Sequence, residues 1–171
     1  MAPNPILRRK REAIVREHMD SENRHEFDAT MATFEHPRYE LIATGEIYDG
    51  PEEVAEYFES SRRAFPDQRN ELLALHHADD AVLVEAVVRG THLGPLRSLP
   101  PTGKAYELPI LAVFMFDGDK LTCERVYFDS NTVLRQLGVA RDPLSITGRL
   151  GTLASHPLTI GRGLVRQVIK R

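Results

Sequence analysis

The feature that most constrains the fold is an apolar stretch followed by a tight turn and a second strand-like stretch. Residues 106–116 are apolar at both parities, so a strand here has both faces covered. An Asp-Gly-Asp turn follows at 117–119, and residues 121–129 then read as the last strand. The pattern predicts a β-hairpin whose first strand lies inside a packed fold.

The rest of the chain reads as helices first and strands afterwards. Helices are predicted at residues 6–19, 25–34 and 51–64, strands at 38–45, 69–77 and 81–91, and a closing helix at 130–137. Helices followed by hairpin-linked strands predict an α+β fold with helices on one face of a curved antiparallel sheet. Such a sheet encloses a pocket, and pockets of this kind usually bind small molecules.

The length of 171 residues fits one domain plus a tail. We assign residues 1–140 to the domain and 141–171 to a C-terminal extension. The extension reads as a loop over 142–159 and a short amphipathic helix from 160 onward. The apolar positions of that helix are Ile160, Leu164, Val165, Val168 and Ile169.

Composition narrows the function classes. The net charge is −3, so we expect neither a nucleic-acid partner nor a membrane partner. Basic clusters at residues 8–11 and 162–171 are interpreted as solvated ends rather than binding patches. Cys123 is the only cysteine, which fits a reducing compartment. The first residues lack the apolar core of a signal peptide, so we expect a cytoplasmic protein.

Asp129 is the strongest catalytic candidate. On a regular strand it shares one face with Tyr127, Arg125 and Cys123. A carboxylate among aromatic and apolar neighbours is desolvated, which raises its pKa and suits a general acid or base. The alternative is that Asp129 caps the helix predicted at 130–137.

Two histidines are further candidates. His36 lies where the first strand begins, and His92 lies where a strand meets a Pro- and Gly-rich loop. Each has a structural alternative, a backbone-bonded histidine at a junction or in a turn. His76 and His77 are adjacent in a strand and point to opposite faces, and no zinc-ligand spacing occurs, so we predict no metal site.

Several short motifs occur together in a fixed order. They lie at residues 48–54, 90–94, 100–104, 116–121, 124–129 and 133–138. This ordered set resembles the SnoaL-like polyketide cyclase branch of the nuclear-transport-factor-like superfamily, over about residues 10–140. The resemblance implies a cone-shaped α+β barrel, commonly dimeric, with a hydrophobic cavity and no cofactor.

The resemblance also implies a reaction. In the cyclases, an aspartate late in the final strand region removes a proton next to a carbonyl, and the enolate closes a ring. Asp129 matches that position, with Tyr127 and His36 or His92 polarising the oxygen. We expect a small hydrophobic, polyketide- or steroid-like substrate. Its predicted contacts are Tyr127, Arg125, Tyr39, Phe58 and Phe114.

Two other functions stay open. The strand at 111–116 is wholly apolar where the cyclases place polar groups, which favours a non-catalytic binding module or dimeric scaffold. An epoxide hydrolase would need a compact Asp–Arg–Asp set, of which Arg125 and Asp129 supply two members. Cyclase or isomerase chemistry, cofactor-free and in a homodimer, is the preferred expectation.

Overall fold

The computed structural model describes residues 4–169, which form six helices and six strands within that range. In chain order they are α1 (Pro5–Asn23), α2 (Phe27–Met31), β1 (Arg38–Leu41), β2 (Glu46–Asp49), α3 (Pro51–Ala64), β3 (Arg69–His77), β4 (Ala81–Thr91), β5 (Ala105–Asp117), β6 (Lys120–Tyr127), α4 (Ser130–Gln136), α5 (Ile146–Ser155) and α6 (Pro157–Ile169).

The strands form one curved sheet in the order β2-β1-β6-β5-β4-β3. The predicted hairpin is confirmed, since β5 and β6 pair antiparallel and Gly118 has the positive φ of a tight turn. The sheet is not wholly antiparallel, because β1 pairs parallel with β6. Since β2 and β3 are its two edges, the sheet is open rather than closed into a barrel.

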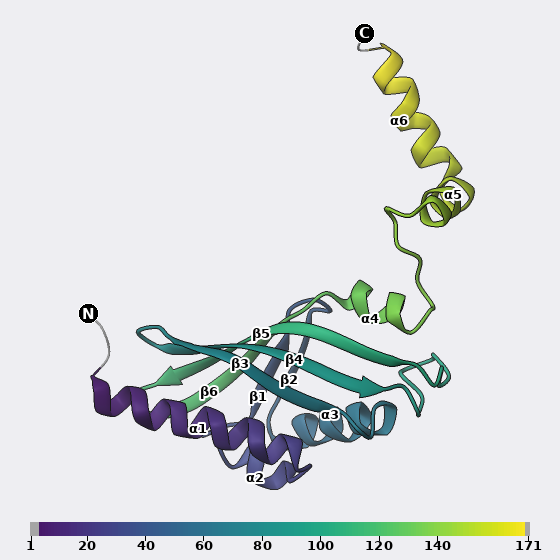
Figure 1. Cartoon of the computed structure of the whole chain (residues 1–171). Coiled ribbons are helices and arrows are strands. Elements are labelled where there is room, and N and C mark those ends of the chain that lie inside the picture. The colour runs from purple at the N-terminus through teal and green to yellow at the C-terminus, as the bar shows by residue number, and fades with distance from the viewer. Residues whose placement is uncertain (1–3, 170–171) are drawn as a thin grey trace.

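Helices α1, α2 and α3 lie together on one face of the sheet, here called the inner face (Figure 1). The main core fills the space between these helices and the inner face of the sheet. It is built from Val15 and Met19 of α1, Val54 and Phe58 of α3, and inner-face side chains of β1, β4, β5 and β6. The predicted α+β class is therefore confirmed. A second, smaller core lies where the C-terminal end of α3, the start of β5 and α4 meet.

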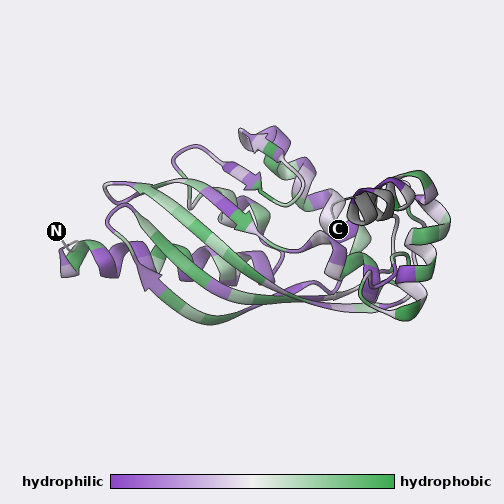
Figure 2. Cartoon of the chain, turned by 90° about the horizontal axis from the view of Figure 1, so that it is seen from above, coloured by the Kyte–Doolittle hydropathy of each residue, from purple (hydrophilic) through white to green (hydrophobic). Residues whose placement is uncertain are grey.

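The outer face of the sheet carries charged side chains in ion pairs and a band of half-buried apolar ones. Arg89 of β4 pairs with Glu71 of β3 and Glu107 of β5, so one arginine ties three strands. Leu83, Leu111 and Val113 lie beside each other on this face by strand register. Seen from above, the strands show long apolar stretches (Figure 2).

The C-terminal extension projects away from the sheet (Figure 1). The prediction of a loop over 142–159 is wrong for part of that range, because α5 occupies Ile146–Ser155. The next helix, α6, begins at Pro157 rather than at residue 160. Leu164, Val165, Val168 and Ile169 have side chains outside the described part of the structure. None of the helices within residues 4–169 combines the length and apolar composition that a bilayer crossing requires.

Candidate functional site

Helix α1 places two ionisable side chains in the core. Asn4 caps its first turn and Pro5 occupies the first helical position. Val15, His18, Met19 and Glu22 follow at helical spacing of three and four, so they share the face that packs on the sheet. An apolar residue is usual at a position that packs on the sheet, yet two of these four positions hold His18 and Glu22.

The sheet supplies the partners of His18 from three neighbouring strands. Tyr39 on β1 is paired in register with Glu124 on β6, and Glu124 is paired with Phe114 on β5. All three side chains are buried on the inner face. The His18 ring lies above this row, 5.3 Å from the Phe114 ring and 6.0 Å from the Tyr39 ring, centroid to centroid.

Hydrogen bonds fix the orientation of the His18 ring. Its Nδ1 lies 2.8 Å from Thr33 Oγ1, whose own hydroxyl proton is donated to the Thr30 carbonyl at 2.7 Å. Thr33 Oγ1 therefore accepts, and Nδ1 carries a proton. The other nitrogen, Nε2, lies 2.6 Å from the Tyr39 hydroxyl, which points to a Tyr39 donor when the ring is neutral.

Glu124 completes this arrangement. Its Oε2 lies 3.0 Å from His18 Nε2, a contact that is an ion pair only when the ring carries both protons. By geometry this contact is not a hydrogen bond, and Oε2 has no hydrogen-bond partner of acceptable distance and angle among the described residues, although Glu124 is close enough to the Tyr39 hydroxyl to help raise its pKa. A buried carboxylate oxygen without a donor is costly, and such atoms in native structures often have a functional cause. We call His18, Tyr39 and Glu124 the inner cluster.

A second buried ion pair lies beside the inner cluster. Arg62 of α3 donates to Glu22 Oε1 at 3.2 Å, and its guanidinium carbon lies 5.6 Å from the centre of the Phe27 ring. Burial raises the pKa of Glu22, the nearby Glu124 raises it further, and Arg62 opposes both. Burial also raises the pKa of Tyr39 well above its usual value. The inner face therefore gathers ionisable side chains whose charged form is disfavoured by burial.

Asp129 lies outside this site, and the prediction that it is desolvated among aromatic and apolar neighbours is wrong. It is exposed and serves as the N-cap of α4, where it accepts from Asn131 N at 3.0 Å and Thr132 Oγ1 at 2.6 Å. The Thr132 hydroxyl and the Asn131 amide hold the pKa of Asp129 below its usual range. The alternative, a helix cap, is the one found, because β6 ends at Tyr127 and the alternation stops there.

Three other predicted residues also lie away from the inner cluster. His36 is exposed and bonds Asp49 at 2.8 Å. Arg125 points to the outer face, where it donates to Glu40 at 2.7 Å, and Tyr127 is 41% exposed. The Asp–Arg pair that an epoxide hydrolase would need is thus not assembled by Arg125 and Asp129.

His92 is fully buried but belongs to the second core. Its Nδ1 accepts from Thr102 N at 3.2 Å, so its proton is on Nε2, for which the described residues offer no acceptor. Its ring lies 5.4 Å from the Phe65 ring. Of the predicted residues, only Tyr39, Phe58 and Phe114 meet in the main core.

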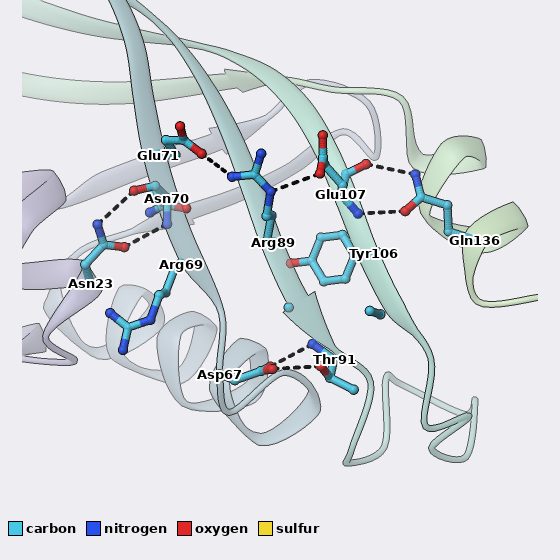
Figure 3. Close-up of a pocket in the computed structure, with 12 residues that line it drawn as sticks. Asn23, Asp67, Arg69, Asn70, Glu71, Arg89, Thr91, Tyr106, Glu107 and Gln136 are labelled. Atoms are coloured by element: carbon cyan, nitrogen blue, oxygen red, sulfur yellow. Dashed lines mark hydrogen bonds and ion pairs between the residues drawn. The ribbon is translucent and has the colours of Figure 1, made fainter.

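The larger of two described surface grooves, about 650 Å³, lies over the ends of β3, β4 and β5 (Figure 3). There the Asn23 side chain bonds both backbone groups of Asn70, at 2.8 and 2.7 Å. The smaller, about 380 Å³, lies on α6. Neither groove is lined by a member of the inner cluster. Over the described residues, no group of three or more His, Cys, Asp or Glu side chains could hold a metal ion.

Sequence reasoning missed His18, Glu124, Glu22 and Arg62. A signal for two of them was present in α1, where His18 and Glu22 interrupt the apolar stripe of Val15 and Met19. Glu124 alternates with Arg125 and shares its face with Val126, which is buried. Polar residues at core-facing positions therefore marked the site more reliably than the acid at the end of the strand.

Comparison with known proteins identifies the family. The model of the SnoaL-like polyketide cyclase family matches residues 12–137. A search of curated proteins finds no match. Similar solved structures include a putative polyketide cyclase from Xanthomonas campestris pv. campestris, with 20% identity, a TM-score of 0.70, and coverage of 77% of this chain and 98% of that one.

Two further structures are similar over most of their length. A putative SnoaL-like polyketide cyclase from Jannaschia sp. CCS1 has 18% identity and a TM-score of 0.68, covering 83% of this chain and 99% of that one. A phenazine biosynthesis-related protein from Pseudomonas aeruginosa has 23% identity and a TM-score of 0.66, with 83% and 94% covered. At such identities the likeness shows the fold alone.

Proposed function

We propose that this chain, which belongs to the SnoaL-like polyketide cyclase family, uses its inner cluster as a cofactor-independent acid–base site for a hydrophobic carbonyl compound. The observation that carries the proposal is Glu124 Oε2, a buried carboxylate oxygen without a hydrogen-bond donor, 3.0 Å from His18 Nε2. The role first assigned to Asp129 passes to Glu124, five residues earlier in the chain.

The roles follow from what each group can give or accept. Glu124 takes the proton from the carbon next to the substrate carbonyl, and the electron pair moves onto the oxygen as an enolate. The Tyr39 hydroxyl, which in the resting site contacts His18 Nε2 at 2.6 Å, turns its one proton to that oxygen and donates a hydrogen bond to it. In a cyclisation the enolate carbon attacks a second carbonyl of the same molecule, and Glu124 returns its proton to the new alkoxide. In an isomerisation the proton returns to a different carbon.

The surroundings favour an aromatic or polycyclic substrate. Phe34, Phe58 and Phe114 line the same side of the sheet as the inner cluster. Phe27 stacks on Phe58 with centroids 4.7 Å apart, and Tyr48 stacks on Tyr57 at 4.8 Å. When these side chains move apart, a flat ring between them gains both apolar burial and ring stacking.

A substrate reaches the inner cluster only when covering side chains move, since His18 is 0% and Tyr39 2% exposed. We place that movement at α2, a helix of five residues whose N-cap makes no side-chain hydrogen bond. It carries Phe27 and Met31, which pack on the main core. Hydrogen exchange should be faster in α2 than in α1 and should slow when a ligand binds. Equal protection in both helices would contradict this placement.

Proton abstraction can be measured without the natural substrate. We would incubate the protein with 2-acetylnaphthalene, an aryl methyl ketone, in D2O and follow deuterium at the methyl carbon by NMR. The protein should accelerate exchange, and Glu124→Gln should lower the rate about 10²- to 10⁴-fold, as for other general bases. Binding of the probe by calorimetry without accelerated exchange would instead support the binding-module reading. Neither binding nor exchange, for this ketone and larger polycyclic ones, would refute both.

We also propose that the protein is a homodimer formed through the outer face of the sheet. Strand β5 is apolar at both parities, yet α1, α2 and α3 all lie on the inner face (Figure 1). Leu83, Leu111 and Val113 are only half-buried on the other side. Sedimentation should give a dimer that Val113→Glu dissociates, while Ile47→Glu, at an exposed edge-strand position, leaves it intact. A clean wild-type monomer at micromolar concentration would refute the dimer.

A further inference from the structure

The C-terminal segment, residues 141–171, carries charge of the opposite sign to the rest of the chain. It holds six basic residues and one acidic residue, a net charge of +5. Residues 1–140 hold 16 basic and 24 acidic residues, a net charge of −8. The whole-chain value of −3 hides this division. An anionic surface therefore attracts the segment and repels the body.

The one acidic residue of the segment is already used within the fold. Asp142 Oδ1 accepts from Leu144 N at 2.9 Å and lies 3.6 Å from Arg135 Nη1 at the end of α4. In contrast, Arg149, Arg162 and Arg166 are exposed, and no carboxylate in the described part of the chain lies at ion-pair distance from them. The positive charge of these three arginines is thus free to meet an external partner.

One side of helix α5 packs against the connecting segment, and the other side is exposed. Its small residues face the connecting segment, since a Cβ on Gly148 would overlap the Asp142 carbonyl and one on Gly151 would crowd the Arg141 side chain. Ser145 caps the helix by accepting from Gly148 N at 3.0 Å. The opposite side presents an apolar stripe to solvent.

That stripe continues beyond α5. Large aliphatic side chains are exposed before, along and after the helix: Leu144 (77%), Ile146 (78%), Leu150 (60%), Leu153 (48%) and Leu158 (75%). Ile146, Leu150 and Leu153 follow one another at spacings of four and three, as on one helix face. Both helices stand clear of the sheet (Figure 1), so this apolar surface is not part of either core.

We propose that residues 141–169 bind the surface of an anionic lipid bilayer, lying in the interface with the exposed leucines inserted and the exposed arginines at the headgroups. Exposed aliphatic side chains beside unpaired arginines are the combination that interfacial helices use. A bilayer offers an apolar interior and a negative surface together. The expectation of no membrane partner rested on the whole-chain charge, which conceals the basic segment.

The binding surface also sets the orientation of the protein. The acidic body is repelled by the same lipids, so contact is made by the extension alone, with the body held off the bilayer. A protein whose proposed substrate is a hydrophobic carbonyl compound would thereby work beside the phase into which such compounds partition. The lipid interaction itself does not depend on that proposed reaction.

Co-sedimentation of the full-length protein with vesicles tests the proposal. Vesicles of phosphatidylglycerol and phosphatidylcholine in equal amounts should carry the protein down at low salt, and pure phosphatidylcholine vesicles should not. Replacing Arg162 and Arg166 with Gln should weaken binding about 25-fold, at about fivefold for each charge. Changing Arg9 and Arg63, also exposed, to Gln should leave it within about twofold if charge position matters.

A second pair of variants tests the apolar contribution. Leu150→Gln with Leu158→Gln should abolish sedimentation with the vesicles, whereas Leu73→Gln with Leu93→Gln, exposed leucines on the body, should preserve it. Thermal melting would show that the fold is unchanged in each. Failure of the wild-type protein to bind anionic vesicles would overturn the proposal. So would loss of a dimer, rather than of lipid binding, in the Leu150 and Leu158 variant, since that assigns the surface to a second copy.

Discussion

The two faces of the sheet treat their charged side chains in opposite ways. On the outer face, Arg89 joins Glu71 and Glu107 in an exposed ladder across three strands, and every member has both a partner and water. On the inner face, Glu124 is buried, touches His18, and keeps one oxygen without a donor. Both arrangements use glutamate on a β-strand, yet only one leaves unused hydrogen-bonding capacity in a dry environment.

This difference distinguishes charged side chains that only link strands from charged side chains that suit a reaction. Exposed pairs are screened by water and contribute little, so they can be lost without much effect. A buried carboxylate near a histidine and a tyrosine costs stability, and it is retained where it does something else. The helix-covered face, rather than the end of a strand, is therefore where the chemistry of this fold is expected.

The largest stability difference should separate the two arginine pairs. Arg62→Met leaves Glu22 buried without its cation and should lower the free energy of unfolding by about 3–5 kcal/mol. Arg89→Met breaks an exposed ladder and should leave the free energy of unfolding nearly unchanged. Urea denaturation of both variants measures the contrast. Similar losses for the two would mean that burial of the Arg62–Glu22 pair is not what distinguishes the faces.

A smaller difference is expected between two tyrosines. Tyr39→Phe removes the hydroxyl that contacts His18 Nε2 at 2.6 Å and should destabilise the protein by about 1–2 kcal/mol. Tyr127→Phe changes a partly exposed residue and should alter stability by less than about 0.5 kcal/mol. Thermal denaturation of the pair gives the comparison. An unchanged midpoint for Tyr39→Phe would show that the inner hydrogen bond is not formed.

The smallest effect, and the most diagnostic in sign, is in the pH dependence. The pKa of Glu22 is raised from 4.5, so its contribution to stability is present below that value and lost as pH rises through the folded pKa. The pKa of Asp129 is lowered from 3.8, so its contribution is present above that value and lost as pH falls.

Stability curves of Glu22→Gln and Asp129→Asn against wild type should therefore slope in opposite directions. Wild type should lose stability relative to Glu22→Gln as pH rises above 4.5. It should lose stability relative to Asp129→Asn as pH falls below 3.8. Denaturation midpoints collected across this range give both slopes from the same series. Slopes of one sign would show that the two carboxyls do not differ in environment as described.

Local patterns in the sequence predicted much of the fold. The hairpin of β5 and β6 was predictable because the continuous apolar run and the Asp-Gly-Asp turn act within a few residues. The start of α3 was predictable because Pro51, Glu52 and Glu53 suit a first helical turn. The parallel pairing of β1 with β6 was not, since it joins segments 85 residues apart, as for Tyr39 and Glu124. No local sequence pattern indicates such a contact.

The prediction of the candidate site failed for the same reason, since its residues also lie far apart in the sequence. His18 and Glu124 are brought together by the packing of α1 on the sheet, and no pattern within either segment pairs the two. Asp129 did show one, but Thr132 and the start of α4 supply a sufficient local reason for an aspartate there. Helix α5 was missed because Gly148 and Gly151 indicate a loop, whereas both fit closely against the connecting segment.

The most direct test of the account compares the two carboxylates in one assay. Deuterium exchange into 2-acetylnaphthalene would be measured with Glu124→Gln and with Asp129→Asn, at equal concentrations of folded protein. The account predicts that Glu124→Gln loses the acceleration and that Asp129→Asn keeps it within about twofold. Loss of exchange in Asp129→Asn, with Glu124→Gln still active, would contradict it and return the chemistry to the end of the strand.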